Sequence, residues 1–221
     1  MDSKNELDHR FLDSLGKVKG INVDIWIEDA NDFLSQKNEY LEILSKEEID
    51  RASQFRYASE QLFYEISHAR LRLKLSEKTG IFPSEIEYLY TDFGKPYFPG
   101  STLAFNLSRS RNYFAYIIEP ACECGIDLEI LYEPFEMKGI LNNYFSLNER
   151  NYILNANDKK EELKRFYIVW TRKESFLKMT GIGLNSDLQD TCVFEKAKNE
   201  QIWTNSFIHK SCIISFSRTK V

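Results

Sequence analysis

Asp127 and Glu129 are acidic residues that alternate with apolar ones in segment 125–130, which reads Gly-Ile-Asp-Leu-Glu-Ile. In a β-strand, a period of two places both carboxylates on one face and the apolar side chains on the other. Two neighbouring carboxylates could bind a hard cation. An amphipathic edge strand with a solvated acidic face would have the same pattern, so this segment alone leaves both interpretations open.

A third carboxylate, Glu174, belongs to segment 170–178, where helical spacing aligns Trp170, Glu174 and Lys178. We expect Trp170 and Leu177 on the buried side, which puts Glu174 at the edge of the packed face. Lys178 could pair with Glu174 or with an anionic ligand. The alternative is a surface Glu–Lys pair, worth roughly a few tenths of a kcal/mol.

The three carboxylates would need a counter-charge if they met in the fold. Two carboxylates roughly 5 Å apart repel by about 3 kcal/mol at an effective dielectric constant of about 20. Either protons or a cation could relieve this repulsion. A magnesium ion, before calcium, is suited to carboxylate and phosphate oxygens. Zinc is disfavoured, because the sequence has no histidine or cysteine pattern typical of zinc sites.

Segment 105–110, Phe-Asn-Leu-Ser-Arg-Ser, is a second place where polar residues gather. We interpret residues 106–112 as a polar loop between two strands. The asparagine, two serine hydroxyls and the arginine of this segment, with main-chain amides, could hold phosphate oxygens; they are Asn106, Ser108, Arg109 and Ser110. Serine and asparagine are also ordinary turn residues. Lys95, in the Gly-Lys-Pro turn at 94–96, is either a further cation for a ligand or a surface lysine.

Hydrophobic periodicity, capping residues and glycines predict the elements that must position these residues. A capping box at Ser45 and Glu48 indicates a short helix. Further helices are expected at 59–79, ending at Gly80, and at 135–144, 147–154 and 159–179. Strands are expected at 21–27, 103–105, 113–118, 124–131, 192–194 and 212–216.

This order of elements predicts an α+β protein with two lobes of similar size. We expect a polar N-terminal extension at 1–20, an N-terminal lobe at 21–123 and a C-terminal lobe at 124–221. No low-complexity linker separates the lobes, so they should share an interface. The sequence contains no repeat strong enough to demonstrate duplication.

Composition limits the function classes. The chain has 221 residues, 43% hydrophobic, and a net charge of −5, which argues against disorder and against a broad basic surface for nucleic acid. It shows no signal peptide and no apolar run of the roughly 20 residues that span a membrane. We expect a cytoplasmic monomer whose four cysteines are reduced: Cys122, Cys124, Cys192 and Cys212.

In this order, the segments resemble the 4′-phosphopantetheinyl transferase superfamily and, by chain length, its Sfp type. The resemblance covers about residues 44–184. Its matching pieces are Gly94-Lys95-Pro96, Phe105-Asn-Leu-Ser108, Gly125-Ile-Asp127-Leu-Glu129, Trp170-x-x-Lys173-Glu174-Ser-Phe-x-Lys178 and Gly181-x-Gly183-Leu.

The resemblance implies two α+β lobes related by a pseudo-twofold axis, with coenzyme A bound between them. Asp127, Glu129 and Glu174 match the family's Mg²⁺ site, and Lys178 matches a lysine that contacts the pyrophosphate. Lys95 and Ser108 match positions at the nucleotide end. The implied reaction transfers phosphopantetheine to a serine of an apo carrier protein and releases adenosine 3′,5′-bisphosphate. Glu174 or a metal-bound water would take the serine proton.

Two positions depart from the family pattern. Arg109 stands where the motif F-N-x-S-H-S has a histidine, and arginine can bind a phosphate through two N–H groups but does not titrate. Phe63 aligns with an arginine of the family's long helix, so one charged contact, typically worth about 1.5–3 kcal/mol, would be lost. These two replacements would change either the affinity for coenzyme A or the choice of the phosphopantetheine donor.

The first half contains a cluster of basic residues: Lys46, Arg51, Arg56, Arg70 and Arg72. This cluster could be a docking patch for the carrier protein. Acidic residues are interleaved with it, so an ordinary solvated surface is an equal alternative. Two other functions stay open. The chain could bind carrier proteins with little catalysis. It could also be a Mg²⁺-dependent transferase or hydrolase for another pyrophosphate compound.

Overall fold

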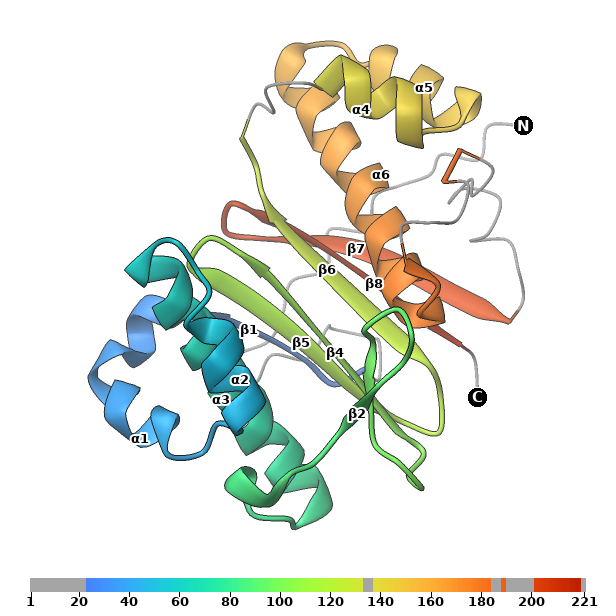
Figure 1. Ribbon diagram of the computed structural model, residues 1–221. Coiled ribbons are helices and arrows are strands. Elements are labelled where there is room, and N and C mark those ends of the chain that lie inside the picture. The colour runs from blue at the N-terminus through green and yellow to red at the C-terminus, as the bar shows by residue number, and fades with distance from the viewer. Residues whose placement is uncertain (1–22, 133–136, 184–187, 190–200, 220–221) are drawn as a thin grey trace.

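The computed structural model describes residues 23–132, 137–183, 188–189 and 201–219. The expected N-terminal extension at 1–20, the expected strand at 192–194 and Cys192 lie outside these residues. The described chain is a mixed α+β fold with two three-stranded antiparallel sheets, which confirms the predicted fold class. Figure 1 shows a long helix lying over each sheet.

The first half builds the sheet β1-β5-β4. Its strands are β1 (Ile25–Asp29), β4 (Leu103–Ser110) and β5 (Tyr113–Pro120), and a small hairpin consists of β2 (Leu89–Tyr90) and β3 (Pro96–Tyr97). The helices are the 3₁₀ segments η1 (Ala30–Gln36) and η2 (Pro83–Glu85) and the α-helices α1 (Lys37–Leu41), α2 (Lys46–Ala52) and α3 (Ala58–Thr79).

The second half builds the sheet β6-β8-β7. It contains β6 (Cys124–Ile130), α4 (Met137–Tyr144), α5 (Leu147–Leu154), α6 (Lys159–Thr180), β7 (Ile202–His209) and β8 (Cys212–Thr219). Both halves share one topology, in which a strand and helices precede a hairpin whose last strand is central. A pseudo-twofold axis would produce this likeness, but the axis and the lobe boundaries at 21–123 and 124–221 stay predictions.

The two long helices begin and end where the sequence predicts. Helix α3 buries Ile66 and Ala69 and stops at Gly80, whose φ of +75° is the left-handed conformation that glycine adopts most easily. Helix α6 stops in the same way at Gly181, with φ +69°. The capping box of Ser45 and Glu48 is confirmed at the start of α2.

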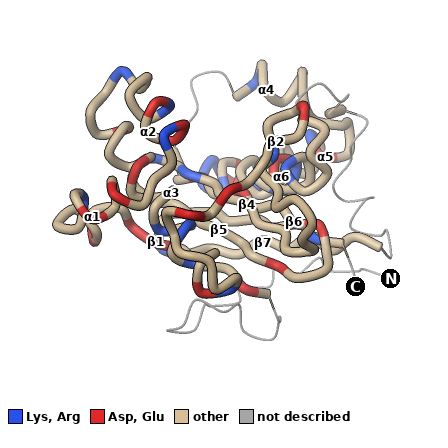
Figure 2. Tube along the Cα trace, turned by 60° about the horizontal axis from the view of Figure 1, so that its bottom comes forward, with Lys and Arg blue, Asp and Glu red and all other residues tan. Residues whose placement is uncertain are grey.

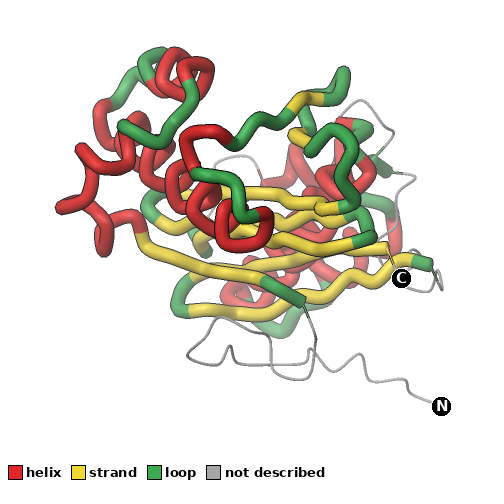
Figure 3. The backbone as a smooth tube through the Cα atoms, turned by 90° about the horizontal axis from the view of Figure 1, so that it is seen from below, coloured by secondary structure: helices red, strands yellow, loops and turns green. Residues whose placement is uncertain are grey.

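The two sheets share an apolar core, which confirms the expected interface between the halves. Ile25 and Ile117 of the first sheet pack in one cluster with Ile126, Leu128 and Ile214 of the second. Two further clusters lie between α3 and the first sheet and between α6 and its helical neighbours. Figure 3 shows the strands of both sheets close together with helices beside them.

Each half contains a buried ion pair between a capping-box glutamate and its long helix. Glu48 accepts a hydrogen bond of 2.6 Å from Arg72 Nε, and both side chains are almost completely buried. Glu149, which caps α5 with Ser146, pairs with Lys173 at 2.9 Å. Arg72 follows Glu48 by 24 residues in the sequence, and Lys173 follows Glu149 by the same number. The two pairs therefore occupy equivalent places in the shared topology.

Glu48→Ala is expected to lower the free energy of unfolding by about 3–5 kcal/mol, because it leaves the Arg72 guanidinium buried without its carboxylate. Urea unfolding monitored by circular dichroism measures this loss. Glu162→Ala is the matched control, since Glu162 pairs with the largely exposed Lys159 and should cost no more than about 0.5 kcal/mol. Equal losses for the two variants would contradict the assignment of Glu48.

Several expectations about the polar segments are wrong. Residues 106–110 are not a loop but continue β4 up to a tight turn at 111–112. Arg72 is buried, so it contributes neither to a basic docking patch nor to a solvated surface. Arg70 is partly exposed, but its charge is paired with Glu28 at 2.5 Å. Figure 2 shows basic and acidic residues interspersed along the described chain.

Three cysteines fall within the described residues, and all three are free and buried: Cys122, Cys124 and Cys212. Their state agrees with the expectation of unpaired thiols. Within the described residues, each helix is too short or too polar to cross a membrane.

Candidate active site

The acidic face of β6 lies against α6. Asp127 is buried and Glu129 is half-buried, whereas Ile126 and Leu128 enter the shared core on the opposite face. The predicted period of two is therefore confirmed. At Gly125 the strand contacts the helix backbone directly, because a Cβ there would lie 2.2 Å from the Ser175 carbonyl oxygen. This close approach brings the α6 side chains next to the β6 carboxylates.

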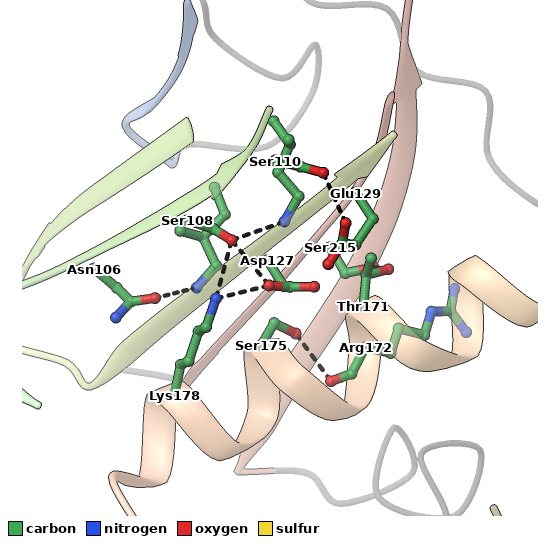
Figure 4. Close-up of polar contacts among 12 residues, drawn as sticks. Asn106, Ser108, Ser110, Asp127, Glu129, Thr171, Arg172, Ser175, Lys178 and Ser215 are labelled. Carbon is green, nitrogen blue, oxygen red and sulfur yellow. Dashed lines mark hydrogen bonds and ion pairs between the residues drawn. The ribbon is translucent and has the colours of Figure 1, made fainter. Parts of the chain in front are cut away.

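Lys178 reaches from α6 to Asp127. Its Nζ donates to Asp127 Oδ1 at 2.7 Å and to Ser108 Oγ at 3.0 Å (Figure 4). Glu174 lies one helical turn before Lys178 and faces the same cavity, which has a volume of about 420 Å³. Its lining is mostly polar and consists of Leu107, Ser108, Arg109, Asp127, Glu129, Trp170, Glu174 and Lys178.

Burial and mutual repulsion both disfavour negative charge on the two glutamates. Desolvation, followed by the Asp127 charge, raises the pKa of Glu129 to about 7 even though Ser110 donates a hydrogen bond to it. The same two causes raise the pKa of Glu174 to about 6, against the opposing effect of Lys178. A cation in this cavity would stabilise the ionised form of both groups.

The donor set suits a magnesium ion. All candidate ligands are carboxylate oxygens, and Asp127 Oδ2 is buried without a hydrogen-bond partner. Among the described residues, however, no three His, Cys, Asp or Glu side chains lie close enough together to hold a metal by themselves. The three carboxylates thus line one cavity without forming a closed cage. This arrangement fits Mg²⁺, which commonly takes one or two carboxylates and completes its shell with phosphate oxygens.

A second cavity, of about 330 Å³, adjoins the first. Leu107, Arg109, Glu174 and Lys178 line both. Its other walls come from α3, the β2–β3 hairpin and β4, and they are rich in aromatic side chains: Tyr64, Tyr88, Tyr90, Phe93 and Phe105. The pair of cavities could therefore hold an aromatic base in one part and phosphate groups beside the carboxylates in the other.

Arg109 brings a half-buried positive charge to the second cavity. Its guanidinium lies over the rings of Tyr64, at 4.8 Å, and Phe55, at 5.5 Å. Burial lowers its pKa, and the nearby Arg51 lowers it further. Among the described residues, no carboxylate lies within ion-pair distance of Arg109. Arg51 and Arg109 line this cavity together, and guanidinium groups of this kind can bind phosphate oxygens through several N–H donors.

Lys95 also lines the second cavity, but its ammonium group is already bound. Nζ donates to the Met179 carbonyl oxygen at 2.6 Å and forms an ion pair with Glu123. Lys95 therefore ties the β2–β3 hairpin to the C-terminal end of α6. The expected contact between Lys95 and a nucleotide stays a prediction.

Sequence reasoning missed two residues of the second cavity. The sequence suggests only a basic patch for Arg51 and no role for His68, yet both line this cavity. Burial and the Arg109 charge lower the pKa of His68 to about 3, so its ring is neutral at neutral pH. Helical spacing pointed to neither residue, because their convergence depends on how α2 and α3 pack.

Comparison with known proteins identifies the class of protein to which this fold and site belong. Residues 123–217 match the model of the 4′-phosphopantetheinyl transferase superfamily. The chain is also 33% identical, over 165 residues, to the 4′-phosphopantetheinyl transferase ffp of Bacillus subtilis, a match that covers 68% of this chain and 71% of that protein. The chain therefore belongs to the 4′-phosphopantetheinyl transferase superfamily, as its sequence motifs predicted.

Other relatives carry related names. The 4′-phosphopantetheinyl transferase HetI of Nostoc sp. strain PCC 7120 is 30% identical over 154 residues, which cover 68% of this chain and 65% of HetI. The L-aminoadipate-semialdehyde dehydrogenase-phosphopantetheinyl transferase of Rattus norvegicus is 30% identical over 66% of this chain. That match covers 51% of the rat protein, so the chain matches between about half and seven-tenths of these relatives.

Proposed function

We propose that this chain transfers the 4′-phosphopantetheine group from coenzyme A to a serine of an apo carrier protein in a Mg²⁺-dependent reaction. The relatives' names support the transferase activity. We also propose, as the sequence leads us to expect, that the protein is a cytoplasmic monomer and that it binds neither nucleic acid nor membranes.

One observation carries this function. Carboxylates from β6 and α6 line a cavity that adjoins an aromatic, arginine-lined cavity. Coenzyme A contains an aromatic base, a separate phosphate and a pyrophosphate. The base would match the aromatic side chains, the separate phosphate the arginines, and the pyrophosphate, with its metal ion, the carboxylates. Asp127, Glu129 and Glu174 would hold the metal, and Lys178 and Arg109 would bind phosphate oxygens.

The reaction exchanges one phosphorus–oxygen bond for another. The carrier serine oxygen attacks the β-phosphorus, the pyrophosphate bridge breaks, and adenosine 3′,5′-bisphosphate leaves. When bound, Mg²⁺ would neutralise the pyrophosphate and the charge that develops on the leaving group. Glu174, which lines both cavities, or a water bound to the metal would accept the serine proton. The Lys178 ammonium group would leave Asp127 and bind the pyrophosphate.

The test is a transfer assay. The protein, an apo carrier protein, coenzyme A and Mg²⁺ are incubated, and the carrier is weighed by mass spectrometry. The proposal predicts a mass gain equal to one phosphopantetheine group, which disappears when Mg²⁺ is chelated. Several apo carriers that all remain unchanged, although a known transferase modifies them, would contradict it. A donor other than coenzyme A that alone supports transfer would favour a different pyrophosphate substrate.

Arg109→Ala is expected to raise the KM for coenzyme A by about 10- to 100-fold, since a hydrogen bond to a charged group contributes about 1.5–3 kcal/mol. Arg109→Lys should restore part of the affinity by keeping the charge. Steady-state kinetics with a saturating carrier measures both variants. Arg56→Ala is the control, because Arg56 is exposed and absent from the lining of both cavities. An unchanged KM in Arg109→Ala would rule out this role.

A further inference from the structure

Three side chains on β4 replace a main-chain ladder at the junction of the two sheets. Asn106, Ser108 and Ser110 alternate along β4 and face the free edge of β6 (Figure 4). Each accepts a hydrogen bond from a main-chain N–H of β6. The donor–acceptor distances are 2.9 Å from Ile126 to Asn106, 3.2 Å from Leu128 to Ser108, and 3.3 Å from Ile130 to Ser110.

These bonds fix the direction of the serine hydroxyl hydrogens. A hydroxyl that accepts from an N–H still has one hydrogen to donate. Ser108 Oγ donates it to Asp127 Oδ1 at 2.9 Å, and Ser110 Oγ donates it to Glu129 Oε2 at 2.8 Å. The same strand edge therefore orients two serines, and each serine holds one acidic side chain.

Neither serine is arranged to bind a nucleotide. Ser108 Oγ accepts from the Leu128 N–H and from Lys178 Nζ and donates to Asp127, so its hydrogen-bonding capacity is filled. Ser110 is absent from the described residues that line the two cavities. Both hydroxyls instead donate hydrogen bonds to carboxylates that line the first cavity.

We propose that Ser108 and Ser110 are positioning residues, whose hydroxyls are fixed by the edge of β6 and hold Asp127 and Glu129 in the orientation that binds the cation. This inference rests on the proposed function, since it assigns the supports of the same metal site. It also changes the expected role of Ser108, from a nucleotide contact to a support of Asp127 and Lys178.

The test compares Ser110→Thr with Ser110→Val. Threonine and valine have nearly the same shape and both favour strands, so the two variants differ mainly in the hydroxyl group. Mn²⁺ serves as the probe, and its binding to the full chain is measured by electron paramagnetic resonance without and with coenzyme A. Thermal unfolding of both variants shows whether the fold is kept.

We expect Ser110→Val to weaken Mn²⁺ binding about 10-fold, the lower end of the range for groups that orient metal ligands. Ser110→Thr should stay within about 2-fold of the wild type, because it keeps the donor to Glu129. The KM for coenzyme A at saturating metal should be the same in both variants. Equal Mn²⁺ affinities in the two variants, alongside binding by the wild type, would overturn this inference and leave the proposed function standing. A wild type that binds Mn²⁺ neither alone nor with coenzyme A, yet transfers phosphopantetheine, would instead overturn the proposed metal site.

Discussion

Asp127→Asn is expected to reduce phosphopantetheine transfer at least about 1,000-fold while the protein stays folded. Asparagine keeps the size of the side chain but removes the charge that pairs with Lys178 and faces the cavity. A metal ion contributes several kcal/mol of charge stabilisation in the transition state. Losing about 4 kcal/mol corresponds to about three powers of ten in rate.

The rate of carrier modification, followed by mass spectrometry, measures this effect. Asp32→Asn is the matched control, because Asp32 is exposed in η1 and should be replaceable without loss of activity. Circular dichroism should give similar melting curves for both variants. If Asp127→Asn keeps more than about a tenth of the wild-type rate, the carboxylate cannot supply a major part of the catalysis.

Gly125→Ala is expected to lower the free energy of unfolding by about 3 kcal/mol or more, the upper end of the cost of overpacking. The added Cβ would lie 2.2 Å from the Ser175 carbonyl oxygen and 2.3 Å from the Met179 nitrogen. Both are main-chain atoms of α6, so they cannot move aside as a flexible side chain can. Either β6 and α6 separate, which displaces Glu174 from Asp127, or the chain fails to fold.

Urea unfolding and the transfer assay together test Gly125→Ala. Gly80→Ala is the comparison, since a Cβ added at Gly80 would have nothing within 4 Å and only the φ of +75° is unfavourable. That conformation costs an alanine about 1–2 kcal/mol. A Gly125→Ala variant as stable as Gly80→Ala and fully active would refute the claim that backbone contact at Gly125 positions the site.

Regular periodicity made much of the fold predictable. The bounds of α3 and α6 follow from helical spacing and from the terminal glycines Gly80 and Gly181. The alternation in β6 predicted which residues face the core and which face the cavity. These elements could be read from sequence because local preference and tertiary packing favour the same structure.

Strands β4 and β7 were harder to predict because polar residues interrupt them. Asn106, Ser108 and Ser110 have the composition of a turn, yet their main chain pairs with β5 and their side chains bond to β6. Residues 202–209, which form β7, were not predicted as a strand. There, Ser206 is buried and bonds to Ser215 of β8 and to Arg172 of α6. Tertiary hydrogen bonds override local propensity in both strands.

The candidate site was predicted in part. The three carboxylates and Lys178 were identified from spacing and resemblance, and the structure brings them to one cavity. The position of Arg51 in the lining of the second cavity could not be foreseen, because it depends on the packing of α2 beside α3. The metal, the donor and the roles of the individual residues remain proposals.

Calorimetric titration of coenzyme A, with and without Mg²⁺, tests the central claim most directly. If Glu174 of α6 joins Asp127 and Glu129 of β6 around a cation that meets the pyrophosphate, Mg²⁺ should strengthen coenzyme A binding at least about 10-fold in the wild type. Glu174→Gln should lose most of this gain. Coenzyme A binding that is equally strong without Mg²⁺, and unchanged by Glu174→Gln, would contradict the claim.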